Sequence, residues 1–280
     1  MHEGGHRLSA VPDNDSPLLE LRGIEKRFGA VRALAGVDFD VRAGEVVALA
    51  GDNGAGKSTL VKVITGVGPA DAGTIAFDGQ TVRIASPHDA TTLGVAAVYQ
   101  DLALCDNLDV VENLFLGREA RRGGRRGPLD PITMEQRAGT LLASLSIGNL
   151  GDVRREVGTM SGGQRQSVAI TRALLGDARL IVLDEPTAAL GVVQTEQVLS
   201  LVRRLRDRGL GVVLVSHNLA DVFAVADRIA VLRLGRNAGV FAADPDRRSD
   251  VVAAITGVSG DLTPAAASAI SPAGASEDCE

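Results

Sequence analysis

Short runs of apolar, largely β-branched residues alternate with helical patterns over most of the chain. This alternation predicts an α/β fold in which crossover helices join the strands of a mostly parallel sheet. The clearest strand candidates are residues 46–50, 95–99, 180–183, 212–216 and 229–234. Further strands are predicted near the N-terminus, at residues 19–21, 37–41 and 74–77.

Helical patterns fill the intervals between the predicted strands. Residues 194–208 carry apolar side chains at helical spacing, and the pattern stops at Gly209. Ser86 followed by Pro87 is typical of a helix start. Residues 106–158 lack strand runs and have a mainly helical pattern, so we predict a helical insertion in the α/β core.

Composition excludes some classes of function. The 280 residues include 35 acidic and 29 basic side chains, a net charge of −6, with six Phe, one Tyr and no Trp. Stacking surfaces and a broad basic face, which nucleic-acid binders need, are therefore not expected. The longest uncharged stretch, residues 262–276, consists mainly of Ala, Ser, Pro and Gly, so no membrane span is expected. Two cysteines 174 positions apart favour a reducing cytoplasm over a disulfide framework.

The two ends of the chain differ from its middle. Residues 1–17 are polar, and residues 258–280 carry four acids, no bases and no periodic pattern. We predict a flexible N-terminal tail and a disordered acidic C-terminal tail. A single domain is expected over residues 18–257, with a helical subdomain at about 102–175.

The strongest chemical signal is a glycine-rich segment that matches the phosphate-loop pattern G-x-x-x-x-G-K-[ST]. It follows a predicted strand and precedes a predicted helix, residues 58–65. Glycines let backbone N–H groups point at phosphate oxygens, and the helix N-terminus adds partial positive charge. Lys57 is expected to reach the β- and γ-phosphates, and the Ser58 hydroxyl to bind Mg²⁺. The predicted nucleotide-binding residues are Gly51, Asp52, Asn53, Gly54, Ala55, Gly56, Lys57, Ser58 and Thr59.

A second nucleotide-binding element ends the strand candidate 180–183, where Asp184 and Glu185 are adjacent. Side chains alternate along a strand, so the two carboxylates are expected to point in different directions. Asp184 is then predicted to lie near Mg²⁺, while Glu185 polarises a water for attack on the γ-phosphate.

The sequence MSGGQ, residues 160–164, precedes this element, and Gln164 lies 20 residues before Asp184. It resembles the signature loop, usually LSGGQ, of ATP-binding cassette (ABC) ATPases, and the likeness extends over roughly residues 18–257. A serine and two glycines at a helix start also favour a second anion-binding N-terminus. The resemblance implies a P-loop NTPase fold with an N-terminal antiparallel β portion and an inserted helical subdomain. It also implies that Ser161, Gly162, Gly163 and Gln164 contact the ATP held by a second subunit.

Three further residues match family motifs in the family's order. Gln100, after the strand 95–99, is similar to the Q-loop glutamine, which senses Mg²⁺ and contacts the membrane partner. His217 is similar to the switch histidine, which contacts the γ-phosphate. The resemblance thus implies catalysis by Glu185, His217 and Lys57. Phe28 matches the aromatic residue that stacks on adenine, although a plain core role for Phe28 stays open.

One residue departs from the family pattern. Gly191 stands where many members have the Asp of the D-loop, which communicates across the dimer. The preceding phrase EPTAAL, residues 185–190, resembles ATPases of monosaccharide importers, in which that Asp is often replaced. Many of those ATPases are two fused cassettes, so the length of this chain suits the single-cassette, fructose-type branch.

The resemblance implies an ATP-hydrolysing subunit on the cytoplasmic face of the cell membrane. Two copies would bind two ATP molecules with Mg²⁺, each between one chain's phosphate loop and the other's residues 161–164. Hydrolysis would energise import of a small solute, expected to be a monosaccharide. The expected partners are a second copy, transmembrane permease subunits and, through them, a solute-binding protein; contact with the membrane would run only through these subunits. The alternative is a soluble non-transport ABC ATPase of the translation or DNA-repair type.

Overall fold

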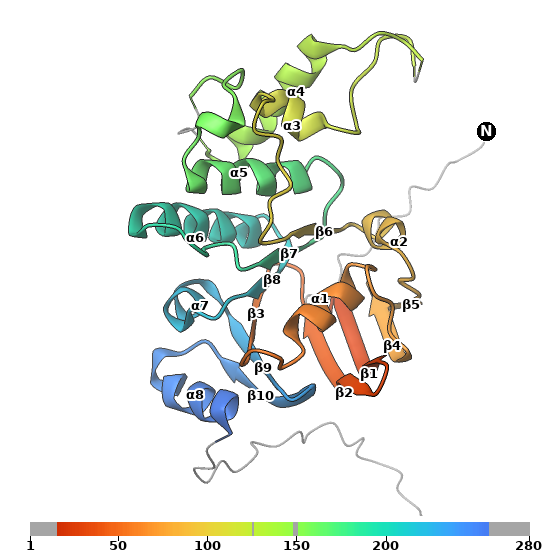
Figure 1. Ribbon diagram of the computed structural model, residues 1–280, viewed down its shortest axis with the longest axis vertical. Helices are drawn as coiled ribbons and strands as arrows, with labels where there is room; N and C mark the ends of the chain where they lie inside the picture. Colours follow the sequence, from red (N-terminus) through yellow and green to blue (C-terminus); the bar gives the residue numbers. More distant parts are fainter. Residues whose placement is uncertain (1–15, 125, 148–150, 258–280) are drawn as a thin grey trace, which may run out of the picture.

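The computed structural model describes residues 16–124, 126–147 and 151–257, and it contains two sheets (Figure 1). A six-stranded sheet has the order β10-β9-β3-β8-β7-β6 and is parallel except for β10. A four-stranded antiparallel sheet has the order β2-β1-β4-β5. The strands are β1 (Leu19–Phe28), β2 (Val31–Val41), β3 (Val46–Ala50), β4 (Ala72–Phe77), β5 (Gln80–Val82), β6 (Val95–Val98), β7 (Leu180–Asp184), β8 (Gly211–Val215), β9 (Arg228–Arg233) and β10 (Arg236–Ala242).

The predicted strands of the six-stranded sheet are confirmed, each within one residue at either end. Their continuous apolar runs reflect burial on both faces, as in β3 and β8, where every residue is buried. The N-terminal candidates prove to be parts of the longer strands β1, β2 and β4. Two strands were missed, β5 and β10, because both are largely exposed and carry no apolar run.

Helices occupy the connections. They are α1 (Lys57–Ile64), α2 (Pro87–Thr92), α3 (Val110–Phe115), α4 (Pro131–Ser144), α5 (Gly162–Ala173), α6 (Val192–Asp207), α7 (Leu219–Val225) and α8 (Arg248–Thr256), with short 3-10 turns η1 (Val157–Thr159) and η2 (Pro245–Arg247). The predicted start at Ser86 is confirmed, since its hydroxyl accepts a hydrogen bond from the Asp89 N–H. The predicted helix 194–208 begins two residues earlier, at Val192.

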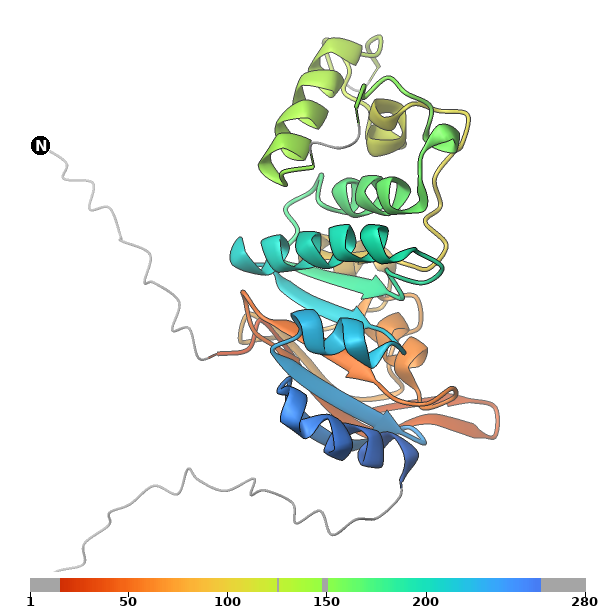
Figure 2. The same ribbon diagram turned by 90° about the vertical axis from the view of Figure 1, so that its left-hand side faces the viewer.

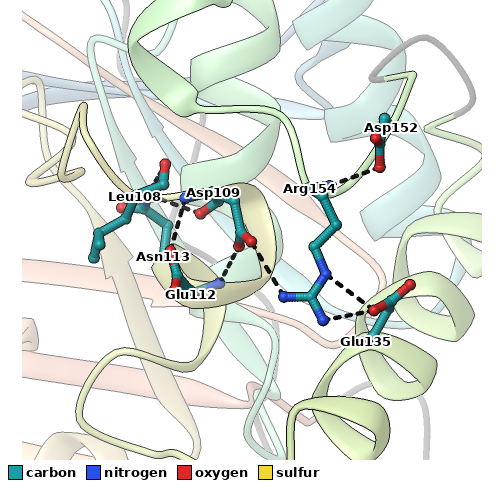
Figure 3. A network of polar contacts seen from close by, with 7 residues as sticks. All are labelled: Leu108, Asp109, Glu112, Asn113, Glu135, Asp152 and Arg154. Atoms are coloured by element: carbon teal, nitrogen blue, oxygen red, sulfur yellow. Dashed lines mark hydrogen bonds and ion pairs between the residues drawn. The ribbon is translucent and has the colours of Figure 1, made fainter.

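In the part of the segment between β6 and β7 that the structure describes, the helices are α3, α4, η1 and α5. Arg154 holds it together by pairing with Asp109 at 3.2 Å and Glu135 at 2.6 Å (Figure 3). Asp109 and Glu112 close a capping box at the start of α3. These contacts tie α3, α4 and the chain before η1 into one unit, which lies at the opposite end of the molecule from α8 (Figure 2).

Apolar cores lie on both faces of the six-stranded sheet. One core fills the space between this sheet, the four-stranded sheet and α1, and another packs the sheet against α5 and α6. Arg228 on β9 joins the two sheets through ion pairs with Asp40 and Glu45, and these carboxylates raise its pKa. None of the described helices combines the length and apolar character that crossing a membrane requires.

Candidate nucleotide-binding site

The candidate site lies where four neighbouring strands end. β3, β8, β7 and β6 are parallel and adjacent, so their carboxyl ends share one edge of the sheet. Residues 51–59, the phosphate loop, follow β3, His217 follows β8, and Asp184 and Glu185 end β7. In open α/β sheets this edge is where ligands bind.

Backbone conformation in the phosphate loop explains two of its glycines. Gly51 has φ 151° and Gly56 has φ 107°, both in the region that L side chains avoid. A Cβ atom at Gly51 would lie 2.3 Å from the Leu232 carbonyl oxygen, and one at Gly56 would lie 2.9 Å from that of Ala33. Both positions therefore require glycine for conformation and for space.

Lys57 starts α1 and reaches back across the phosphate loop. Its ammonium donates hydrogen bonds to the carbonyl oxygens of Gly51 at 2.7 Å and Asp52 at 3.0 Å. The start of α1 has no side-chain cap and no acidic residue in its first turn. The helix end thus presents partial positive charge beside the lysine, which suits a polyphosphate.

A pocket of about 570 Å³ lies over the phosphate loop. Its other walls are Val31, Arg32 and Ala33 from the β1–β2 hairpin, and Leu234 and Gly235 from the β9–β10 turn. The Gly235 N–H donates to the Ala55 carbonyl at 2.9 Å, while the Gly235 carbonyl accepts from Ala35. The loop is therefore supported from outside by segments distant in the sequence.

Glu185 and His217 are in direct contact. Nδ1 of His217 lies 2.8 Å from Oε2 of Glu185, and the Glu185 side chain is mostly buried while that of His217 is 73% exposed. Glu185 has φ 51°, and its N–H donates to the Val215 carbonyl of β8. This backbone bend turns Glu185 toward the end of β8, away from the course of β7.

Asp184 lies beside Glu185 in a half-buried position. Burial raises the pKa of Asp184, the neighbouring Glu185 raises it further, and Lys57 acts in the opposite direction. Lys57 offsets the negative charge of the two neighbouring carboxylates only in part, and such a cluster suits a cation. Ser58 and Gln100 carry uncharged side-chain oxygens, a type of ligand that Mg²⁺ accepts.

The other predicted site residues are Gln100, Phe28 and residues 161–164. Gln100 is exposed two residues beyond β6, whose last register pair is Val98 with Leu183. Phe28 ends β1, is 53% exposed and has the Lys26 ammonium 5.8 Å from its ring centre. Residues 161–164 start α5 and are not among the residues that line the pocket over the phosphate loop.

The start of α5 is a capped helix end. The Ser161 hydroxyl accepts from the Gln164 N–H at 3.3 Å, and the Gln164 side chain accepts from the Ser161 N–H at 3.1 Å. The sequence missed the pocket walls at residues 31–33 and at Leu234 and Gly235. Gly235 contacts the loop through its backbone, which leaves no residue pattern in the sequence.

The sheet edge and phosphate loop define a P-loop nucleotide-binding domain. The family model described as ABC transporter matches residues 34–188. The fructose import ATP-binding protein FrcA of Rhizobium meliloti is 44% identical, over 86% of this chain and 94% of its own length. The xylose/arabinose import ATP-binding protein XylG of Sulfolobus acidocaldarius is 48% identical, over 79% and 86%. A ribose import ATP-binding protein, RbsA 2 of Rubrobacter xylanophilus, is 46% identical, but the chain spans only 44% of its length.

Solved structures agree with these sequence relatives. An ATP-binding cassette of an ABC transporter in its ADP conformation matches with a TM-score of 0.74 and 28% identity, over 86% of this chain and 99% of that one. A dimeric cassette bound to ADP and Pi matches with a TM-score of 0.66 and 25% identity, over 81% and 99%. The chain therefore belongs to the ABC transporter family, as an ATP-binding and ATP-hydrolysing subunit.

Proposed function

We propose that this chain energises import of a monosaccharide, acting as a pair of copies at the cytoplasmic face of a membrane. The relatives named as fructose, xylose/arabinose and ribose import ATP-binding proteins support the choice of solute. The observation that carries the hydrolytic function is the contact between Glu185 and His217 at the strand edge that also holds the phosphate loop.

Lys57 and the start of α1 hold the triphosphate in this proposal. The Lys57 ammonium donates to two loop carbonyls, and phosphate oxygens offer it stronger, charge-assisted partners. Ser58, Asp184 and Gln100 would hold Mg²⁺, which neutralises phosphate charge when bound. Exposed Phe28, at the tip of the hairpin that walls the pocket, offers an apolar face for the adenine ring.

Glu185 acts as the general base. Its carboxylate, which is mostly buried at the strand edge, takes a proton from the water that attacks the γ-phosphorus. His217 touches the same carboxylate from the end of β8, so it orients Glu185 and can donate a hydrogen bond to a γ-phosphate oxygen. Lys57 stabilises the charge that develops on the phosphoryl oxygens.

A second copy completes each ATP site. Residues 161–164 form a capped helix start outside the pocket of their own chain, and a helix start favours anions. The dimeric relative bound to ADP and Pi supports pairing of two copies. ATP between the two copies would then favour the closed dimer, and its cleavage would favour separation.

The permease subunits would dock on a groove of about 520 Å³ between α2, the end of β6 and α5, lined by Tyr99 and Leu102 among others. Arg172 of α5 donates to the carbonyl oxygens of Leu102 and Ala103 at 2.7 and 2.6 Å. Burial and the nearby Arg118 lower the pKa of Arg172. The segment after Gln100 is thereby tied to α5, so movement of one is transmitted to the other.

Replacing Glu185 with Gln tests the hydrolytic assignment. The variant should bind ATP, form a stable dimer, and hydrolyse ATP at least about 100-fold more slowly, because the proton acceptor is lost. Turnover is measured by phosphate release and dimers by light scattering. Glu20→Gln, at a distant ion pair on β1, is the matched control and should behave as wild type. Unchanged turnover in the Glu185 variant would disprove the role of the base.

Transport is tested separately. The full chain, expressed with the membrane proteins encoded beside it, should co-purify with them, and a sugar-loaded binding protein should stimulate ATP hydrolysis in the reconstituted complex. Co-purification with ribosomes or DNA-repair proteins instead would support the alternative of a non-transport ATPase.

A further inference from the structure

Tyr99 stands immediately before Gln100 and is the single tyrosine of the chain. Its hydroxyl donates a hydrogen bond to Oγ1 of Thr65, at 2.9 Å. Thr65 caps the end of α1, the helix that starts at Lys57. The bond therefore links the residue next to Gln100 to the far end of the helix that begins in the phosphate loop.

Thr65 is a firmly held partner for this bond. It is buried, and its own hydroxyl donates to the Val61 carbonyl oxygen, one turn back in α1, at 2.9 Å. A hydroxyl can donate one hydrogen bond and still accept another, so both bonds form at once. Gly66 follows with φ 74°, and a Cβ atom there would collide with the Ser86 carbonyl oxygen at the start of α2. The chain around Thr65 is thus held by α1 on one side and by α2 on the other.

The sheet itself does not extend to Gln100. Among the described strands β6 is an edge strand, paired with β7, and its register ends at Val98. Beyond Gln100, the side chain of Arg172 in α5 holds the carbonyl oxygens of residues 102 and 103. Gln100 therefore lies on a short segment that is tied to α1 before it, through Tyr99, and to α5 after it.

The hydroxyl, rather than the ring, distinguishes a tyrosine at this place. Tyr99 is 37% exposed and lines the groove beside α2, where a phenylalanine would present the same apolar face. The hydroxyl adds a bond to a buried partner within the protein. A side chain held at both ends loses rotamer freedom, and the backbone from which Gln100 extends is restricted with it.

We propose that Tyr99 is a positioning residue, whose hydrogen bond to Thr65 places the Gln100 side chain for the Mg²⁺ that accompanies ATP. This inference rests on the proposed function, in which Gln100 helps to hold Mg²⁺. With the segment fixed in advance, less conformational freedom is lost when the metal binds. Tyr99 should therefore affect the part of ATP affinity that depends on Mg²⁺ and leave the rest unchanged.

The test compares ATP affinity in Mg²⁺ with that in EDTA, by calorimetry on the full chain in the slowly hydrolysing Glu185→Gln background. Tyr99→Phe should reduce the gain in affinity from Mg²⁺ about fivefold, the effect of one lost hydrogen bond, without changing the affinity in EDTA. Thr65→Val should act in the same way, whereas Thr65→Ser keeps the hydroxyl and should retain the wild-type gain. Thr140→Val on α4 is the matched control, because it also removes a hydroxyl that donates to a carbonyl one turn back, that of Gln136.

Raman spectroscopy examines the bond itself. Because Tyr99 is the single tyrosine, the ring doublet that responds to hydrogen bonding of the hydroxyl reports on this bond alone. Thr65→Val should change the intensity ratio of the doublet, and Thr140→Val should not. An unchanged doublet in Thr65→Val would overturn the proposal.

Gln100→Ala separates the inference from the function on which it rests. It should reduce the gain from Mg²⁺ at least as much as Tyr99→Phe does, and adding Tyr99→Phe to it should cause no further loss. If Gln100→Ala leaves the gain unchanged, the Mg²⁺ role of Gln100 in the proposed function fails, and the inference fails with it. If Gln100→Ala lowers the gain but Tyr99→Phe does not, or if the two losses add, the inference alone fails and the proposed function stands.

Discussion

The sheet edge and the start of α5 present the same kind of group, a helix start suited to phosphate, but they are built differently. At the sheet edge, neighbouring parallel strands end together, so backbone register aligns the phosphate loop with Asp184, Glu185 and Gln100. At the start of α5, the Gln194 side chain of α6 packs beside Gly163. Substitutions in the phosphate loop should therefore weaken ATP binding, whereas those at the start of α5 should spare binding and weaken the dimer.

Gly56→Ala should have the largest effect on nucleotide binding. Its φ of 107° is strained for alanine, and the new methyl group would contact the Ala33 carbonyl that supports the loop. We expect ATP affinity, measured by calorimetry, to fall by about two orders of magnitude. Gly79→Ala, with φ 72° and open space, carries similar backbone strain and should keep full affinity. Equal losses in both variants would contradict the steric explanation.

Gly163→Ala should have an intermediate effect that appears only in the dimer. The methyl group would press on the Gln194 stem, so the two helices must separate slightly. We expect unchanged ATP affinity in the monomer and about tenfold slower hydrolysis at saturating ATP. Gly139→Ala on α4, where nothing lies within 4 Å, should leave hydrolysis unchanged and stabilise its helix by about 1 kcal/mol. Loss of monomer ATP affinity in Gly163→Ala would remove the contrast between the two regions.

Asp184→Asn should have the smallest effect of the three, and it should stabilise the fold rather than impair a function. The folded chain raises the pKa of this carboxyl, so ionised Asp184 destabilises the fold above that pKa, and the cost disappears as pH falls. Without nucleotide or Mg²⁺, the variant should melt about 2 °C higher at pH 8. The difference should shrink as the pH falls through the raised pKa of Asp184, because the wild-type carboxyl then takes up a proton in the folded chain. A constant difference in calorimetric Tm across this range would rule out the electrostatic cause.

Much of the fold is predictable because burial on both faces gives strands a distinctive sequence. β3, β7 and β8 are continuous apolar runs, and each was located within one residue. The exposed strand β10 has no such run and pairs with β9 through its backbone, so its sequence carried no signal.

The candidate site likewise has residues that local motifs indicate and contacts that only the packing of the chain reveals. Gly51, Lys57, Asp184 and Glu185 belong to local motifs whose chemistry is visible in sequence, and the structure places them at one edge. The contact between Gln194 and Gly163, which are 31 positions apart along the chain, is visible only in the packing of α5 on α6.

The support of the phosphate loop by Gly235 has a consequence for the order of events in synthesis. The loop leaves the ribosome nearly 180 residues before Gly235 does, and its motif is then complete as a sequence. The loop is supported from outside, however, by the hydrogen bond that the Gly235 N–H donates to the Ala55 carbonyl. A nascent chain that ends before this turn carries the motif without its final shape. Tight nucleotide binding should therefore appear only after translation has passed β9.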